Sequence, residues 1–177
     1  MNHSGAFIVS KVILTGIALL LLLLCACGAP SGRTKSPTQE RTGNTTINYV
    51  NTWYGFDFSL PESWKGYSIV NDMWKGTPAG SDKTVAKGPI ILIRHPAWSR
   101  EKPRQDIPIM IFTTEQWDEL QKEKFHIGEA PTGPGELGRN SQYVFALPAR
   151  YNFAFPTGYE EVEKILAGKP LQPTDIL

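Results

Sequence analysis

The chain has few of the side chains that bind metals or carry thiol chemistry. Only two of its 177 residues are Cys, and only three are His. Cys25 and Cys27 form one pair with a single residue between them, so no second pair completes a zinc site. Their spacing also differs from the C-x-x-C of redox enzymes, and a disulfide across so short a loop would be strained. We therefore predict no metal site and no cofactor.

An excess of either charge is missing too. The chain has 18 Lys and Arg against 17 Asp and Glu, which gives a formal net charge of +1. Nucleic-acid binding normally needs a strongly basic face, so we expect no nucleic-acid partner. Five Trp, six Tyr and eight Phe argue against disorder along the whole length. The length predicts one domain, or one domain with a tail.

The N-terminal region has an uncharged apolar run, Val12 to Leu24, directly after Lys11. A short cationic segment followed by such a run is typical of an export signal. A membrane span needs about 20 apolar residues, which is more than this run supplies. The alternative is a retained anchor helix, which would place Lys11 inside the membrane at considerable cost.

The apolar run ends in Leu24-Cys25-Ala26-Cys27. This stretch resembles the lipobox of bacterial lipoproteins, in which an aliphatic, a variable and a small residue precede the lipidated Cys. The resemblance implies signal cleavage between Ala26 and Cys27, and diacylglycerol on the sulfur of Cys27. Two acyl chains give stable attachment, so the membrane itself is an expected partner. Cys25 would leave with the signal, and a mature chain without free thiols fits an extracytoplasmic location.

Three regions follow from these features. Residues 1–26 are the predicted lipoprotein signal peptide. Residues 27–48 are the lipidated Cys and a flexible tether, because this stretch is rich in Gly, Pro, Ser, Thr and Asn and has too few apolar residues to form a core. Residues 49–177 are predicted to form a single globular α+β domain.

The expected strands show alternating or continuous apolar residues bounded by turn residues. Continuous apolar runs in the fourth and fifth of them predict central strands that are covered on both faces. The expected strands are Ile47 to Tyr54, Phe56 to Leu60, Tyr67 to Trp74, Pro89 to Arg94, Ile107 to Phe112 and Gln142 to Leu147.

Two segments begin with helix-capping signals. Thr113 and Gln116 are spaced as a capping box, and Gly128 is a suitable end for this helix. Thr157 and Glu160 have the same spacing, with Gly168 at the expected end of the second helix. Short turns between most strands favour antiparallel pairing. We expect an α+β fold in which a single, largely antiparallel β-sheet is flanked by helices.

Two resemblances concern the folded part. The run from Tyr54 to Tyr67, YGFDFSLPESWKGY, resembles the early hairpin of the photosystem II protein PsbP and the nuclear-import factor Mog1. It implies a PsbP/Mog1-like α/β/α sandwich and says little about function. The segments GPIILIRHPAW, PRQDIPIMIFTTEQW and LGRNSQYVFALPARYNF resemble a group of bacterial lipoproteins, and this resemblance carries over no catalytic residues.

The best candidate binding surface follows the fourth expected strand. It consists of Arg94, His95, Trp98, Arg100 and Arg104, which lie at and after the end of that strand. Guanidinium groups suit carboxylates, phosphates or anionic headgroups, and Trp adds a flat contact. The alternative is a solvated loop in which Trp98 folds back over the sheet.

Three common catalytic motifs are missing from the sequence. It has no G-x-S-x-G, no Gly-rich phosphate loop and no H-E-x-x-H. We therefore expect a non-catalytic binding or assembly module that contacts a protein or another ligand of the cell envelope. The alternatives are an envelope-associated enzyme and a structural spacer.

Overall fold

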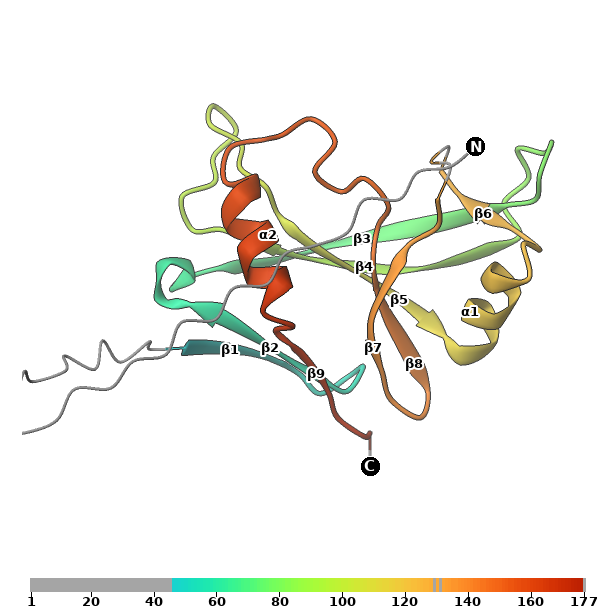
Figure 1. Ribbon diagram of the computed structural model, residues 1–177, viewed down its shortest axis with the longest axis horizontal. Helices are drawn as coiled ribbons and strands as arrows, with labels where there is room; N and C mark the ends of the chain where they lie inside the picture. Colours follow the sequence, from blue (N-terminus) through green and yellow to red (C-terminus); the bar gives the residue numbers. More distant parts are fainter. Residues whose placement is uncertain (1–45, 129, 131, 177) are drawn as a thin grey trace, which may run out of the picture. The chain divides into compact units, whose positions relative to one another are not determined.

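The computed structural model describes residues 46–128, 130 and 132–176, and two antiparallel sheets carry their fold (Figure 1). The smaller sheet has the order β1-β2-β9, and the larger one has the order β6-β3-β4-β5-β8-β7. The bounds of the strands are β1 Thr46–Asn51, β2 Phe56–Pro61, β3 Ser68–Thr77, β4 Ala86–Arg94, β5 Ile107–Thr113, β6 His126–Ile127, β7 Gly135–Arg139, β8 Tyr143–Leu147 and β9 Leu171–Pro173.

Two α-helices and one short 3-10 turn complete the described part of the chain. They are η1 Glu62–Trp64, α1 Thr114–Gln121 and α2 Tyr159–Ala167. Every strand pair in both sheets is antiparallel, which confirms the expected pairing. The expectation of a single sheet was wrong, because β9 returns from the end of the chain to pair with β2.

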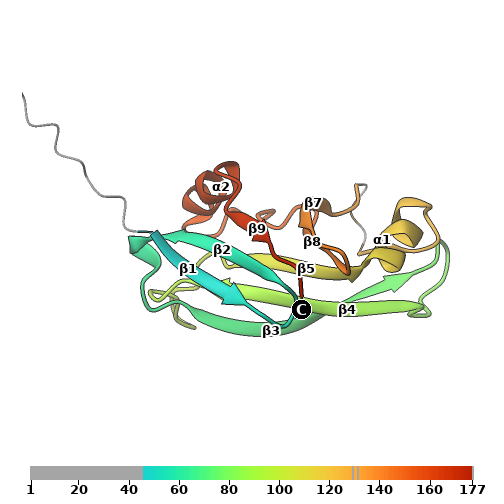
Figure 2. The same ribbon diagram turned by 90° about the horizontal axis from the view of Figure 1, so that it is seen from below.

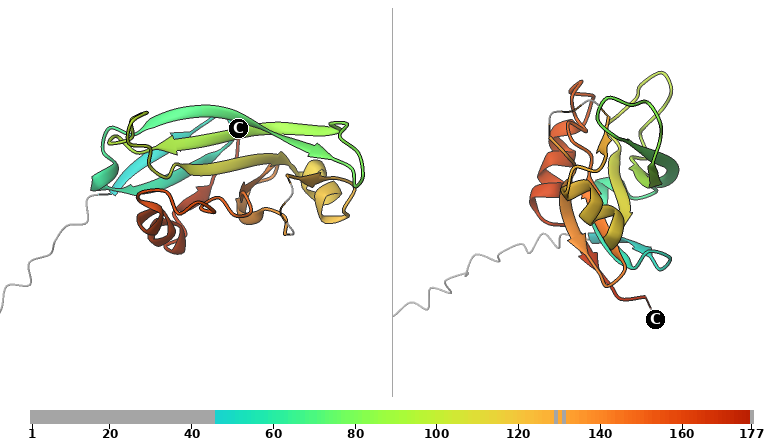
Figure 3. Two further views of the ribbon diagram at one scale, coloured as in Figure 1. Left: turned by 90° about the horizontal axis from the view of Figure 1, so that it is seen from above. Right: turned by 90° about the vertical axis from the view of Figure 1, so that its right-hand side faces the viewer.

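The larger sheet is curled, and both helices lie on the same side of its long strands β3 and β4. Figures 2 and 3 show this arrangement from opposite directions. β1 begins at Thr46, one residue before the expected strand start at Ile47 and within the last residues of the range given to the tether.

Strand β5 is the centre of the core. Its residues from Ile107 to Phe112 are all buried, as the continuous apolar run predicted. One face of β5 packs on β2 and α2, and the other face packs on Trp74 and α1. Strand β4 differs from this expectation, because Ile91 and Ile93 are buried while Ile90 and Leu92 are only half-buried.

Helix α1 begins at the predicted capping box. The Thr113 hydroxyl accepts from the backbone N–H of Gln116 at 3.1 Å, and the Gln116 side chain accepts from the Thr113 N–H at 3.0 Å. The helix ends at Gln121, well before Gly128. Glu123 takes a left-handed φ of 54°, and Phe125 then stacks on Trp74 across the sheet.

The second predicted capping box was wrong. The residue that precedes α2 is Gly158, with φ 84°, and no side chain caps the helix. The predicted end at Gly168 is confirmed, although the left-handed residue there is Lys169, with φ 50°.

Candidate functional site

The predicted lipidation and cleavage site lies outside the described residues. This holds for Ala26 and Cys27, for the signal segment and for the predicted tether as far as residue 45. Within the described part of the chain, no helix combines the length and the apolar character that crossing a membrane requires.

Arg94, at the end of β4, is occupied by contacts within the chain. Its Nη2 donates to Asp106 Oδ2 at 2.7 Å, and its Nε lies 3.1 and 3.2 Å from the two carboxylate oxygens. This hydrogen-bonded carboxylate raises the pKa of Arg94. The guanidinium carbon also lies 3.9 Å from the ring centre of Trp98. Arg94 therefore connects Asp106 and Trp98 within the segment between β4 and β5.

His95 is likewise held by its own loop. Its Nδ1 accepts from the backbone N–H of Ala97 at 3.0 Å, and its ring meets Trp64 edge-on at 5.0 Å. Burial and then the Arg104 charge lower the pKa of His95, against smaller raising effects of Glu161 and the Ser63 backbone. The lowered pKa favours the neutral imidazole, whose Nδ1 is already in use as an acceptor.

Glu161 of α2 connects three segments that are distant in sequence. Its Oε1 accepts from the Ser63 hydroxyl at 2.7 Å, and its Oε2 lies 3.5 Å from Arg104 Nη2. Sequence reasoning missed this cluster because only the fold brings η1, the β4–β5 loop and α2 together. His95 meets the backbone of Ser63 and not its hydroxyl, so Ser63 lacks the His base of a serine nucleophile.

A hollow lies between the β4–β5 loop and the segment that leads into α2. Figure 1 shows these two segments side by side, and the backbone N–H of Gln105 donates to the Thr157 carbonyl at 2.9 Å. The hollow has a volume of about 680 Å³. Its lining residues are Ala97, Glu101, Lys102, Pro103, Arg104, Phe155, Pro156 and Thr157.

The hollow contains one of the five predicted surface residues, Arg104, and adds an aromatic residue that sequence reasoning missed. Phe155 is 68% exposed, and the neighbouring Phe153 is 66% exposed. The predicted residue Arg100 is exposed. The structure therefore moves the candidate site from Arg94, His95 and Trp98 towards Arg104 and Phe155.

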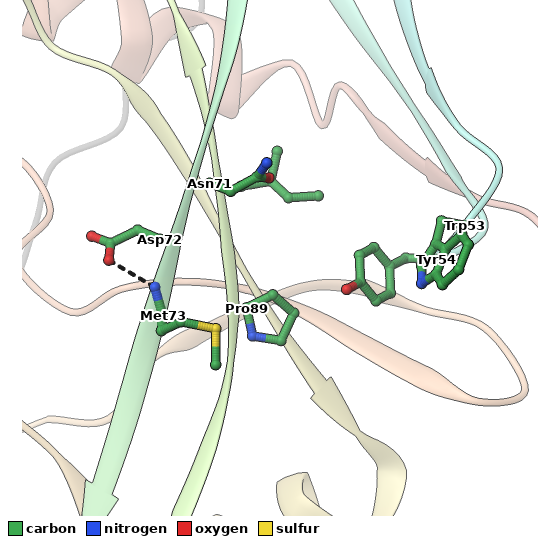
Figure 4. A pocket seen from close by; sticks show the side chains of 7 residues that line it. Trp53, Tyr54, Asn71, Asp72, Met73 and Pro89 are labelled. Atoms are coloured by element: carbon green, nitrogen blue, oxygen red, sulfur yellow. Dashed lines mark hydrogen bonds between the residues drawn. The ribbon is translucent and has the colours of Figure 1, made fainter.

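A second hollow, of about 390 Å³, lies between the β1–β2 turn and the strands β3 and β4 (Figure 4). Its wall includes Trp53, which is 78% exposed, and its floor includes Met73 and Pro89. Asp72 accepts from the Met73 N–H at 2.7 Å, and its carboxylate points away from Tyr54. The lining of this hollow is mainly apolar, and Asp72 is the one charged residue among the described residues that form it.

The described residues contain no group of three or more His, Cys, Asp and Glu side chains that could hold a metal ion. No protein-family model, no curated protein and no solved structure matches the chain. The two sequence resemblances, to bacterial lipoproteins and to PsbP and Mog1, therefore stay predictions.

Proposed function

We propose that the chain is a bacterial lipoprotein, held at an extracytoplasmic membrane face by lipid on Cys27. The sequence Leu24-Cys25-Ala26-Cys27 after an uncharged apolar run supports this proposal. So does the distribution of Cys, since no Cys follows Cys27. The test is the intact mass of the membrane-extracted protein, which should correspond to a chain that begins at Cys27 and carries acyl groups. A Cys27→Ser variant should stay unprocessed and without lipid, and normal processing of that variant would contradict the proposal.

The folded part is, in this proposal, a non-catalytic binding or assembly module. The hollow beside Arg104 and Phe155 carries the proposal, because it combines cationic groups with an exposed aromatic ring in a volume of about 680 Å³. That volume lies within the range of ligand pockets. The groups that an enzyme would use, Ser63, His95 and Glu161, are engaged in contacts between segments.

A photo-crosslinking residue placed at Phe155 in native membranes tests this binding role. We expect a specific adduct at position 155, whose mass identifies its chemical class. The matched control is the same residue at Val85, which is also exposed but lies in the loop between β3 and β4. Equal labelling at both positions, or none at either, would contradict a binding role for the hollow.

For the fold, we propose a relationship to PsbP and Mog1. The motif that supports it forms β2 and η1, and its Trp64 is buried in the core. Both helices lie on one side of β3 and β4, which departs from the implied α/β/α sandwich. An experimental structure whose strand order disagrees with that family would refute the relationship.

A further inference from the structure

The guanidinium of Arg104 has more hydrogen-bond donors than it has acceptors near it among the described residues. An Arg side chain carries five N–H donors. Here the one ion-pair contact within the described residues is the 3.5 Å approach of Nη2 to Glu161, longer than the 2.7–2.9 Å typical of charge-assisted bonds. The Nε of Arg104 is buried and has no partner among the described residues. Because Nε is shielded from solvent, an anionic group from outside would meet the Nη donors, whose one ion-pair contact among the described residues is long.

The guanidinium lies close to Gly158, the residue that precedes α2. A Cβ atom on Gly158 would lie 2.9 Å from Arg104 Nη2, and Gly158 takes a left-handed φ of 84°. Gly158 therefore allows the guanidinium to pack closely against the start of α2. About a quarter of the Arg104 side chain is exposed, at 24%, and the side chain lines the hollow.

The facing wall of the hollow presents Phe155 in an unusual conformation. Its φ of 46° is left-handed, which is rare for a bulky residue. A turn holds it there, in which the Phe155 N–H donates to the Asn152 carbonyl at 2.8 Å. The ring meets Tyr159 edge-on at 5.2 Å and stays largely exposed. Strained residues of this kind cluster at ligand-binding and active sites, where the surrounding structure maintains them.

The charged and apolar residues that line the hollow indicate which class of ligand it would bind. Among the residues that line the hollow, Lys102 and Arg104 are cationic and Glu101 is anionic, while Glu161, 3.5 Å from Arg104 Nη2, lies outside the lining. Phe155 and Pro156 supply an apolar surface beside them, and the Thr157 hydroxyl adds a hydrogen-bonding group. We propose that this hollow binds a ligand with a phosphate or carboxylate next to an apolar part, the anion at Arg104 and Lys102 and the apolar part along Phe155. This proposal rests on the proposed binding function and adds the ligand class. The anion could belong to a free small molecule or to a lipid headgroup.

Hydrogen-exchange mass spectrometry on the full-length protein in neutral detergent tests the ligand class. The probes are hexyl phosphate, inorganic phosphate and hexanol. We expect hexyl phosphate to protect residues 97–104 and 153–158 at lower concentration than inorganic phosphate, and hexanol to give no protection. Protection by hexanol equal to that by hexyl phosphate, or protection by none of the probes, overturns the proposal.

Single-residue variants test whether Arg104 binds the anionic part of the ligand and Phe155 binds its apolar part. Arg104→Gln should weaken hexyl phosphate binding roughly tenfold, and Arg104→Lys should weaken it less because the charge stays. Phe155→Ser should weaken binding of hexyl phosphate and leave binding of inorganic phosphate unchanged. Lys83→Gln, in the exposed β3–β4 loop, is the matched control for loss of a cation. Unchanged exchange in β5 verifies that each variant is folded, and undiminished binding by folded Arg104→Gln overturns the proposal.

Nanodiscs separate the two sources of the anion. Full-length protein is placed in phosphatidylcholine discs with and without phosphatidylglycerol, and hydrogen exchange is measured first without added probe and then with hexyl phosphate. Protection of the same two segments in the phosphatidylglycerol discs supports the proposal and identifies a lipid headgroup. Protection by hexyl phosphate in both discs, without an effect of phosphatidylglycerol, supports it and identifies a free ligand. Failure of all arms overturns the ligand class alone, because the intact mass at Cys27 and the adducts at position 155 test the proposed function separately.

Discussion

At the scale of single residues, His95 makes the stability of the fold depend on pH. Its folded-state pKa lies below the ordinary 6.5, mainly because of burial and secondly because of Arg104. As the pH falls from above 6.5 towards the folded-state pKa, the unfolded chain takes up the proton first. The contribution of His95 is therefore fully present above the unfolded-state pKa, and acidification through this window lowers the free energy of unfolding.

The substitution His95→Asn removes this titration and can retain the acceptor for the Ala97 N–H. We expect the free energy of unfolding to fall less between pH 7.5 and pH 5 in the variant than in the parent chain. Urea unfolding at both pH values measures the difference, and the carboxylates common to both chains cancel. An identical pH dependence in the two proteins would show that His95 titrates normally in the fold.

The ion pair between Arg94 and Asp106 is expected to contribute to the stability of the fold. Its side chains are only 23% and 15% exposed, so the contact is shielded from solvent. Asp106→Asn should lower the free energy of unfolding by about 1–3 kcal/mol, because a charged hydrogen-bonded partner of Arg94 is lost. It should also loosen Trp98, with a red shift of tryptophan emission.

The matched control for this pair is Glu136→Gln. Glu136 pairs with Arg139 on the surface, where the side chains are 33% and 51% exposed. Exposed pairs contribute about 0–1 kcal/mol, so this change should matter less. Equal effects of Asp106→Asn and Glu136→Gln in urea unfolding would disprove the structural importance of the Arg94 contact.

At the scale of elements, the two capping sequences differ in outcome although their spacing is the same. Thr113 caps α1 through both bonds of the capping box, whereas Thr157 makes no cap bond with α2. Thr113→Ala should therefore lower the free energy of unfolding by about 1 kcal/mol, within a range of about 0.5–2 kcal/mol. Thr157→Ala should stay within about 0.5 kcal/mol of the parent. Urea unfolding of both variants tests this, and a larger effect of Thr157→Ala would contradict the observed start of α2.

Local sequence predicted the elements whose signals are local. The capping box at Thr113 and the continuous apolar run of β5 each depend on a few adjacent residues, and both were confirmed. The start of α2 did not follow its local capping signal: Gly158 takes a left-handed φ of 84° and lies against Arg104, which comes from a distant loop. The short strands β6 and β9 give no periodic signal, since their pairing is set by β3 and β2.

In the candidate site, too, features with a local sequence signal were predicted and features that depend on tertiary structure were not. The sequence indicated the β4–β5 loop because Arg and Trp residues gather there, and one of these residues, Arg104, lines the hollow. Phe155 escaped notice because its exposure results from a left-handed backbone. The carboxylate that pairs with Arg94 belongs to Asp106, just before β5, and the one near Arg104 belongs to Glu161 of α2. Tertiary structure brings these groups together.

At the scale of the whole molecule, β5 connects the two core clusters. Ile109 on one face contacts the cluster that includes β2 and α2, and Phe112 on the other contacts the cluster of Trp74 and Trp117. Because both clusters share this strand, neither can lose its packing without weakening the other. We therefore expect the part of the chain that contains both clusters to unfold in one cooperative transition.

Large-to-small substitutions on the two faces of β5 test this cooperativity. Ile109→Ala should cost about 2–5 kcal/mol and Phe112→Ala about 3–5 kcal/mol. Near-UV circular dichroism of the aromatic groups and far-UV circular dichroism of the sheets should report the same midpoint in each variant, with a lower midpoint than in the parent. Ala167→Gly, at the exposed end of α2, is a control that should cost about 1 kcal/mol or less. Separate midpoints for the two probes in either β5 variant would show that the clusters unfold independently, and that β5 does not couple them.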